Sequence, residues 1–227
     1  IQLIPDHFIF YKPRDIVSGD FYWVTEKNDK IVIAVVDCTG HGVPGAFMSM
    51  LGIAFLNEIV NSDVEQKANI ILNRLRVYIK KSLHQTGKDY ETKDGMDISL
   101  CVLDKSNGLL QFAGAYNSLF IISKNQSRTI KGDRMPIGIY RNEKKSFTNH
   151  EIKIYPGDML YMFTDGYIDQ FGGKNKRKFR IAPFKELIVS IHKKTMYEQK
   201  KILKTKFDAW KGPLEQIDDV LVFGFRI

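Results

Sequence analysis

The chain of 227 residues has only two cysteines and seven prolines. Neither Cys38 nor Cys101 belongs to a Cys-x-x-Cys pair, so no disulfide framework or zinc knuckle is indicated. No uninterrupted apolar run approaches the roughly 18 residues that span a bilayer, so no transmembrane segment is predicted. The chain opens at Ile1 without an initiator methionine or signal peptide, and we therefore expect a fragment of a longer protein.

The residues that are present describe an ordinary globular protein. Apolar residues make up 44% and charged residues 26%, which excludes an intrinsically disordered chain. The net charge of +8 is concentrated in a dense basic run at 174–180 and in a second lysine group at 193–206. The second group is most simply the solvated face of a helix, although a basic rim could attract an acidic or phosphorylated partner. Because no nucleic-acid motif accompanies them, no nucleic-acid partner is expected. The cysteine usage favours the cytoplasm.

Hydrophobic periodicity predicts up to nine strands and about four helices. Alternating or continuous apolar runs predict strands at 21–25, 31–37, 96–103, 109–114, 119–123, 151–154, 159–164 and 220–226. Helices are predicted at 46–59, 68–83, 183–192 and 197–210, and the first should be buried because it is apolar nearly all round. Hairpins separated by paired helices favour helices packed outside antiparallel sheets over a doubly wound sheet.

Aspartates recur where predicted strands begin or end. Asp20 precedes a strand, Asp37 and Asp165 end strands, and Asp218 and Asp219 precede the last strand. A carboxylate at the end of an apolar strand is costly unless it is compensated, and a divalent cation with oxygen ligands does this directly. Mg²⁺ or Mn²⁺ is therefore favoured over zinc. The alternative is that each aspartate only caps a turn.

The turn after Asp37 is rich in glycine. Its three glycines are Gly40, Gly42 and Gly45. They permit positive-φ backbone and allow a carbonyl, most simply that of Cys38, to face a metal. The turn could instead cradle phosphate at a helix N-terminus, but it is not a P-loop. His41 is either a proton donor or acceptor near the site or a structural hydrogen-bonding residue of the turn.

Five segments of the chain resemble, in order, the motifs of metal-dependent protein phosphatases. They are Ser18-Gly19-Asp20-Phe21, the run from Val36 to Ala46, Gly114-Ala115-Tyr116-Asn117, Phe163-Thr164-Asp165-Gly166 and Asp218-Asp219-Val220. Over almost the whole chain the resemblance is to the bacterial SpoIIE/RsbU-like branch of the protein phosphatase 2C (PPM) superfamily. It implies an α+β fold, a four-layer αββα sandwich of two antiparallel sheets flanked by helices. Residues 1–227 would form a single phosphatase domain, the C-terminal output domain of a longer regulator.

The resemblance also implies a site for two Mn²⁺ or Mg²⁺ ions that share a water molecule. Asp37 would bridge both ions, and the carbonyl of Cys38 would complete one of the two sites. Asp165 and Asp218 would hold the other ion, with Asp219 as the rival to Asp218 because the doublet leaves the register open by one residue.

For three further residues the resemblance leaves alternative roles open. Asp20 would be a direct ligand or would hold metal-bound water, and Asp97 would face the cleft or bind a third, weaker ion. Asn117 would order the cleft or simply form a turn. Cys38 replaces the family's usual small residue, a change that leaves its carbonyl in place. Arg14 is near the N-terminus, but its spacing assigns it no role.

The activity implied is hydrolysis of phosphoserine or phosphothreonine on a regulatory protein in bacterial signal transduction. The resemblance further implies a STAS-type anti-anti-sigma factor as substrate, an upstream sensor domain, a homodimer and a cytoplasmic location with a possible membrane anchor elsewhere. The helices after Gly45 and at 68–83 would be candidates for an activity switch. The alternatives are a catalytically silent pseudophosphatase that binds a phosphoprotein and a phosphohydrolase that acts on small molecules.

Overall fold

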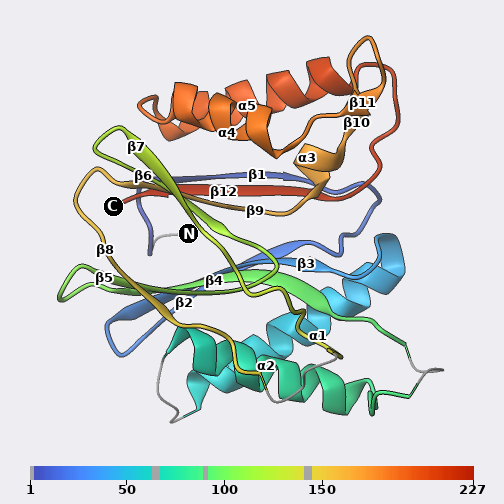
Figure 1. The fold of residues 1–227 in the computed structure, drawn as a ribbon, viewed down its shortest axis with the longest axis vertical. Helices are drawn as coiled ribbons and strands as arrows, with labels where there is room; N and C mark the ends of the chain where they lie inside the picture. Colours follow the sequence, from blue (N-terminus) through green and yellow to red (C-terminus); the bar gives the residue numbers. More distant parts are fainter. Residues whose placement is uncertain (1–2, 63–66, 89–91, 141–144) are drawn as a thin grey trace.

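Two antiparallel β-sheets stack face to face, and helices cover the outer surface of each (Figure 1). The computed structural model describes residues 3–62, 67–88, 92–140 and 145–227, which contain twelve strands and five helices. The layers therefore follow the order helix, sheet, sheet, helix. This arrangement confirms the predicted αββα sandwich.

The first sheet joins the two ends of the chain. In spatial order its strands are β1 (His7–Lys12), β12 (Val220–Arg226), β9 (Met159–Phe163), β6 (Leu119–Ser123) and β7 (Gln126–Ile130). All neighbouring strands are antiparallel, and β12 pairs with β1 from Val220↔Lys12 to Phe225↔His7. Because β12 is covered on both faces, it is apolar along nearly its whole length.

The second sheet carries the motif that follows Asp37. Its spatial order is β2 (Phe21–Lys27), β3 (Lys30–Cys38), β4 (Met96–Asp104), β5 (Leu109–Ala115) and β8 (His150–Lys153). The β2–β3 hairpin turns through Asn28 and Asp29, both at positive φ as a tight two-residue turn requires. The register of β3 and β4 places Asp37 directly opposite Asp97.

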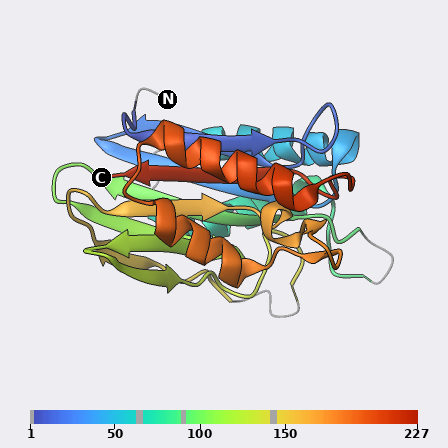
Figure 2. The ribbon, with the colours of Figure 1, turned by 90° about the horizontal axis from the view of Figure 1, so that it is seen from above.

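Two helix pairs bury the outer faces of the sheets (Figures 1 and 2). The helices are α1 (Gly42–Asn61) and α2 (Ala68–Ser82) on the second sheet, α4 (Ile181–Ile191) and α5 (Met196–Lys211) on the first, and the single-turn α3 (Gly166–Asp169) after β9. Between α3 and α4 lies a small hairpin of β10 (Phe171–Gly172) and β11 (Arg177–Lys178). Helix α5 begins with a capping box between Thr195 and Glu198.

Aromatic rings hold the α4–α5 layer on the first sheet. Tyr167 lies at the centre of this cluster, with ring centroids 4.7 Å from Phe184, 5.1 Å from Phe207 and 6.1 Å from Phe10. Its hydroxyl donates to the carbonyl of Leu203 (3.0 Å), so the polar atom is satisfied within the core. The cluster therefore ties β1, α3, α4 and α5 together.

The structure contains more strands and helices than the sequence predicted, and it corrects the predicted burial of the first helix. Strands β1, β7, β10 and β11 and helix α3 were not predicted. The prediction that the helix at 46–59 is buried was wrong, because Phe47 and Met50 on α1 are 64% and 67% exposed. Among the described residues, α1 alone meets the length and composition test for a membrane span. Its inner face packs on the second sheet, so we assign it to the outer helical layer.

We expect Phe184→Ala to lower the free energy of unfolding by about 3–5 kcal/mol, because it empties a fully buried ring site. Urea unfolding measures this change. Tyr197→Ala is the matched control, since its ring is 74% exposed and its loss should change stability by only about 0.5 kcal/mol. Equal effects of the two substitutions would contradict the assignment of this cluster as the attachment of the helical layer.

Candidate metal centre

Four aspartates surround one cavity at the end of the sandwich. The cavity has a volume of about 240 Å³ and is lined by Asp37, Asp97, Asp165 and Asp218. Strands β3 and β4 deliver the first pair from the second sheet, whereas Asp165 follows β9 and Asp218 precedes β12 in the first. Residues far apart in sequence therefore converge because the same ends of both sheets meet here.

Burial and mutual repulsion make these carboxyl groups hard to ionise in the absence of a cation. Burial, followed by repulsion from Asp20, raises the pKa of Asp37 to about 9. Burial followed by repulsion from Asp165 raises the pKa of Asp97 to about 7. The pKa of Asp165 rises to about 6 through burial and then repulsion from Asp218, whose own pKa is also raised by burial. A site with this much unbalanced negative charge is suited to cations.

Asp20 is not among the residues that line the cavity, although its charge acts on Asp37. It is 3% exposed, and its Oδ2 accepts a hydrogen bond of 2.6 Å from the hydroxyl of Thr164. Burial raises its pKa to about 8, although the Thr164 hydrogen bond opposes the rise. Thr164 was not singled out from the sequence, where only its position before Asp165 marks it.

The two adjacent aspartates before β12 have different surroundings. Both side-chain oxygens of Asp219 accept backbone hydrogen bonds of 2.8 Å, one from Arg14 and one from Gly19, and the residue is 2% exposed. Asp218 instead lines the cavity, and its Oδ1 accepts from the backbone N–H of Asp219. Asp219 therefore fastens the loop before β2 to the start of β12, and Asp218 faces the other carboxylates.

The turn after Asp37 presents backbone to the cavity. Cys38 lines it, yet the Cys38 side chain is buried in the core near Ser49, and burial strongly raises the pKa of the thiol. This leaves the backbone of Cys38 as the group that can face a ligand. Gly40 has φ +83°, and a Cβ added at Gly45 would collide with the Gly40 carbonyl oxygen. The turn is thus close-packed as well as sharp.

His41 lies on the cavity rim between two charged groups. Its Nδ1 is 2.9 Å from Oδ2 of Asp15, and its Nε2 is 2.6 Å from Nη1 of Arg14. Since a guanidinium can only donate, Nε2 accepts and Nδ1 carries the proton given to Asp15. Arg14 also donates to the carbonyl of Ile217 (2.9 Å). These contacts favour the structural interpretation of His41 over a free proton donor.

Asn117, the remaining candidate from the sequence, lies outside the cavity, whereas Lys93, which was not predicted, lines it. Asn117 is not among the residues that line the cavity, and its backbone N–H donates to Ala115 in the turn between β5 and β6. This position fits a turn residue. Lys93, which the sequence analysis missed, lines the cavity and is exposed. Its only signal in the sequence is its place four residues before Asp97.

The donors present suit Mg²⁺ or Mn²⁺ better than zinc, since they are carboxylate and carbonyl oxygens. Within the described residues, no group of three or more His, Cys, Asp or Glu side chains is positioned to hold a metal ion by itself. Ions that keep several water ligands do not need such a cage, because one or two carboxylates per ion suffice. The residues therefore fit hydrated divalent cations.

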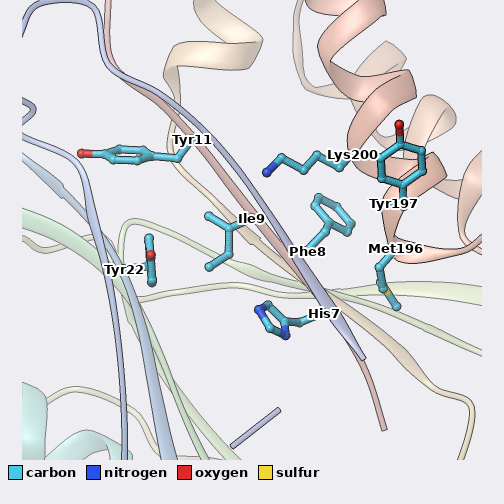
Figure 3. Close-up of a pocket in the computed structure, with 8 residues that line it drawn as sticks. All are labelled: His7, Phe8, Ile9, Tyr11, Tyr22, Met196, Tyr197 and Lys200. Carbon is cyan, nitrogen blue, oxygen red and sulfur yellow. The ribbon is translucent and has the colours of Figure 1, made fainter. Parts of the chain in front are cut away.

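A larger, open cavity of about 560 Å³ lies on the side of the molecule between β1, β2 and α5 (Figure 3). His7, Tyr11, Tyr22 and Lys200 are among its lining residues, none of which carries a carboxylate. It therefore offers no comparable cation site. The Tyr11 hydroxyl donates to the carbonyl of Asp20 (3.0 Å) and so also braces the loop beneath the carboxylates.

This fold is that of PP2C phosphatase domains. The SiaA-PP2C domain of Pseudomonas aeruginosa superposes with a TM-score of 0.87 at 32% identity, covering 97% of this chain and 85% of that one. The PP2C phosphatase domain of SpoIIE from Bacillus subtilis, solved with a fragment of its regulatory domain, gives 0.78 at 21% identity, covering 98% and 63%. The chain belongs to the stage II sporulation protein E (SpoIIE) family, whose model matches residues 27–227. The resemblance to the SpoIIE/RsbU-like branch is confirmed.

Curated relatives are considerably longer than this chain. Stage II sporulation protein E of Bacillus subtilis (strain 168) is 28% identical over 159 residues, which are 70% of this chain and 18% of the relative. Protein IcfG of Synechocystis sp. is 28% identical over 180 residues, with 70% and 28% covered. The chain thus spans less than a third of the length of either relative.

The raised pKa of Asp37 predicts how stability depends on pH without metal. Below about pH 4 the Asp37 carboxyl is protonated in both the folded and the unfolded protein. Between pH 4 and the folded pKa of about 9, it ionises only in the unfolded protein, and this lowers the stability of the folded protein. In EDTA, the free energy of unfolding of Asp37→Asn should therefore be at least about 1 kcal/mol higher than that of the wild type at pH 8. This difference should vanish near pH 4.

Urea unfolding of both proteins across this pH range measures the difference. Asp104→Asn, at the opposite end of β4, is the control, because the pKa of Asp104 is lowered by hydrogen bonds from Ser106. This variant should not gain stability as pH rises. A pH-independent difference between Asp37→Asn and the wild type would refute the raised pKa.

Proposed function

We propose that the chain is a metal-dependent phosphatase that hydrolyses phosphoserine or phosphothreonine on a regulatory protein. The observation that carries the proposal is the gathering of Asp37, Asp97, Asp165 and Asp218 around one cavity in a PP2C-type fold. A structural role for each carboxylate would not require all four to share a buried space. Their raised pKa values mark a cluster that costs free energy unless cations neutralise it.

In this proposal, Asp37 is the central ligand of two Mg²⁺ or Mn²⁺ ions. It lies opposite Asp97 in the sheet register, and repulsion from Asp165 and Asp218 contributes to its raised pKa, so it interacts with every other carboxylate of the cavity. The backbone carbonyl of Cys38 supplements it. A solved relative at 12% identity and a TM-score of 0.65, RsbX, is described in complex with magnesium. When bound, such ions supply an activated water and neutralise phosphate oxygens.

The chain's own residues would position the substrate and the ligands. Asp165 and Asp218 hold the side of the cavity formed by the first sheet, and Asp97 offers a place for a third, weaker ion. Asp20, held by Thr164, would be a direct ligand or would hold metal-bound water. Lys93 on the rim offers a cation to the incoming phosphate. Cys38 is not a suitable nucleophile, because it is buried and its thiol pKa is raised.

The substrate and setting that we propose rest on the resemblance to this family. Solved neighbours include the RsbU and RsbW domains of Rv1364c from Mycobacterium tuberculosis, and that likeness of 19% identity supports the shared fold. We propose a STAS-type anti-anti-sigma factor as the phosphoprotein, an upstream sensor domain in a longer chain, and a homodimer as the working form. The domain would act in the cytoplasm, attached or not to a membrane anchor.

The test is phosphate release from a phosphoserine peptide and from para-nitrophenyl phosphate, with Mn²⁺ or with EDTA. Residues that only hydrogen-bond to metal ligands typically contribute about 10–100-fold, so loss of a direct ligand in Asp37→Asn should reduce Mn²⁺-dependent kcat/KM by at least about 100-fold. Asp104→Asn, at the far end of the neighbouring strand β4 and outside the cavity, should retain wild-type turnover. If calorimetry detects Mn²⁺ binding but neither the wild type nor Asp104→Asn releases phosphate, the result would instead favour the pseudophosphatase.

A further inference from the structure

The hairpin of β10 and β11 carries the densest positive charge of the chain. Five cations and no acid occur between positions 174 and 180, so seven residues hold +5 of the net charge of +8. The five are Lys174, Lys176, Arg177, Lys178 and Arg180. All five are exposed, so their charges face solvent. The proposed chemistry uses none of them.

This hairpin lies at the same end of the molecule as the metal cavity (Figures 1 and 2). The chain passes directly from Asp165 through the single turn of α3 into β10. Within this connection Asp169 donates its backbone N–H to the Asp165 carbonyl (2.9 Å), and its carboxylate pairs with Lys178 (2.6 Å). The basic hairpin is therefore joined to a cavity residue by one helical turn and one ion pair.

The hairpin is held in place by Trp210 of α5. The Trp210 ring packs edge-on against Phe179 with centroids 5.3 Å apart, and its Nε1 donates to the Gln170 carbonyl (3.0 Å). Gly173 in turn donates to the Trp210 carbonyl (2.9 Å), and a Cβ at Gly172 would collide with that carbonyl. Such anchoring holds the backbone that carries the cations in one arrangement, which reduces the entropy lost when they bind a partner.

Most of these cations have no acidic partner. In the described part of the chain, Lys178 alone among the five forms an ion pair, with Asp169. The other four are available to a negatively charged ligand. A nucleic acid or an anionic bilayer held at this end would compete with the substrate for the cavity mouth. An acidic stretch of the substrate itself would not, and the charge of the hairpin is complementary to it.

We propose that the β10–β11 hairpin binds acidic residues that flank the phosphorylated side chain of the protein substrate. The proposal rests on the proposed function and adds a substrate class to it, namely phosphoproteins with an acidic flank. An extended peptide advances about 3.4 Å per residue, so acids several positions from the phosphoserine reach the hairpin while the phosphate occupies the cavity. The hairpin then contributes affinity and encounter rate, and the chemistry stays in the cavity.

The test uses the full chain with Mn²⁺ and three substrates: a phosphoserine peptide flanked by Asp and Glu, a peptide of equal length flanked by Asn and Gln, and para-nitrophenyl phosphate. The variant combines Lys174→Gln, Lys176→Gln and Arg177→Gln. The control removes the same charge at the other end of the α4–α5 layer through Lys193→Gln, Lys194→Gln and Lys201→Gln. Kinetics are measured at low and at high salt.

The hairpin variant should raise KM for the acidic peptide by about 10-fold while leaving kcat, the neutral peptide and para-nitrophenyl phosphate unchanged. The control triple should keep the preference of the wild type for the acidic peptide. High salt should reduce that preference, since exposed charges are screened. Equal KM values for the two peptides in the wild type, or equal effects of the two triples, would overturn the proposal.

Two further readouts separate this proposal from the others. If the wild type releases phosphate from none of the substrates, the proposed function fails, and fluorescence anisotropy of the labelled peptides still tests the hairpin. Preferential binding of the acidic peptide that the hairpin variant loses would then support the docking role, and its absence would refute it. Loss of binding to phosphatidylglycerol vesicles with unchanged peptide kinetics would identify a membrane contact and overturn the proposal.

Discussion

Repulsion among carboxylates at one end of the sandwich is the constraint on which the rest of the structure depends. The register of β3 and β4 forces Asp37 and Asp97 to face each other, and the second sheet brings them to the cavity that Asp165 and Asp218 share. Left alone, these groups favour a looser structure. The fold resists because buried strands, backbone hydrogen bonds and the side-chain hydrogen bonds around Asp219 and Asp20 hold them in place.

The support for this arrangement comes from residues that point away from the cavity. Asp219 accepts two backbone hydrogen bonds and joins the loop before β2 to the start of β12. Gly166 allows the chain after Asp165 to pass against the carbonyl of Asp219, where any side chain would collide. Thr164 connects the same region to Asp20. The hydrogen bonds of Asp219 and Thr164 thus stabilise the backbone around carboxylates that repel one another.

The sequence predicted the layers and most of the elements, because buried strands such as β3 and β12 have strong apolar patterns. It did not predict β7, whose sequence Gln126–Ile130 is polar because this edge strand is largely exposed. Composition also could not show that α1 leaves Phe47 in solvent. At the site, the neighbours Asp218 and Asp219 are indistinguishable in sequence, and only the backbone donors around Asp219 separate their roles.

The acidic cavity and the basic hairpin would bind different parts of the proposed substrate. Without cations, the aspartates of the cavity would repel a phosphate, so entry of the phosphorylated side chain depends on their neutralisation. The cations of 174–180 lie on the surface beyond α3, where they attract an acidic chain whether or not the cavity is neutralised. In the proposed function, retention of the partner by the hairpin and hydrolysis in the cavity would therefore be physically separable. A shift of α1 that moves the turn after Asp37, as the proposed switch requires, would then alter turnover without releasing the bound partner.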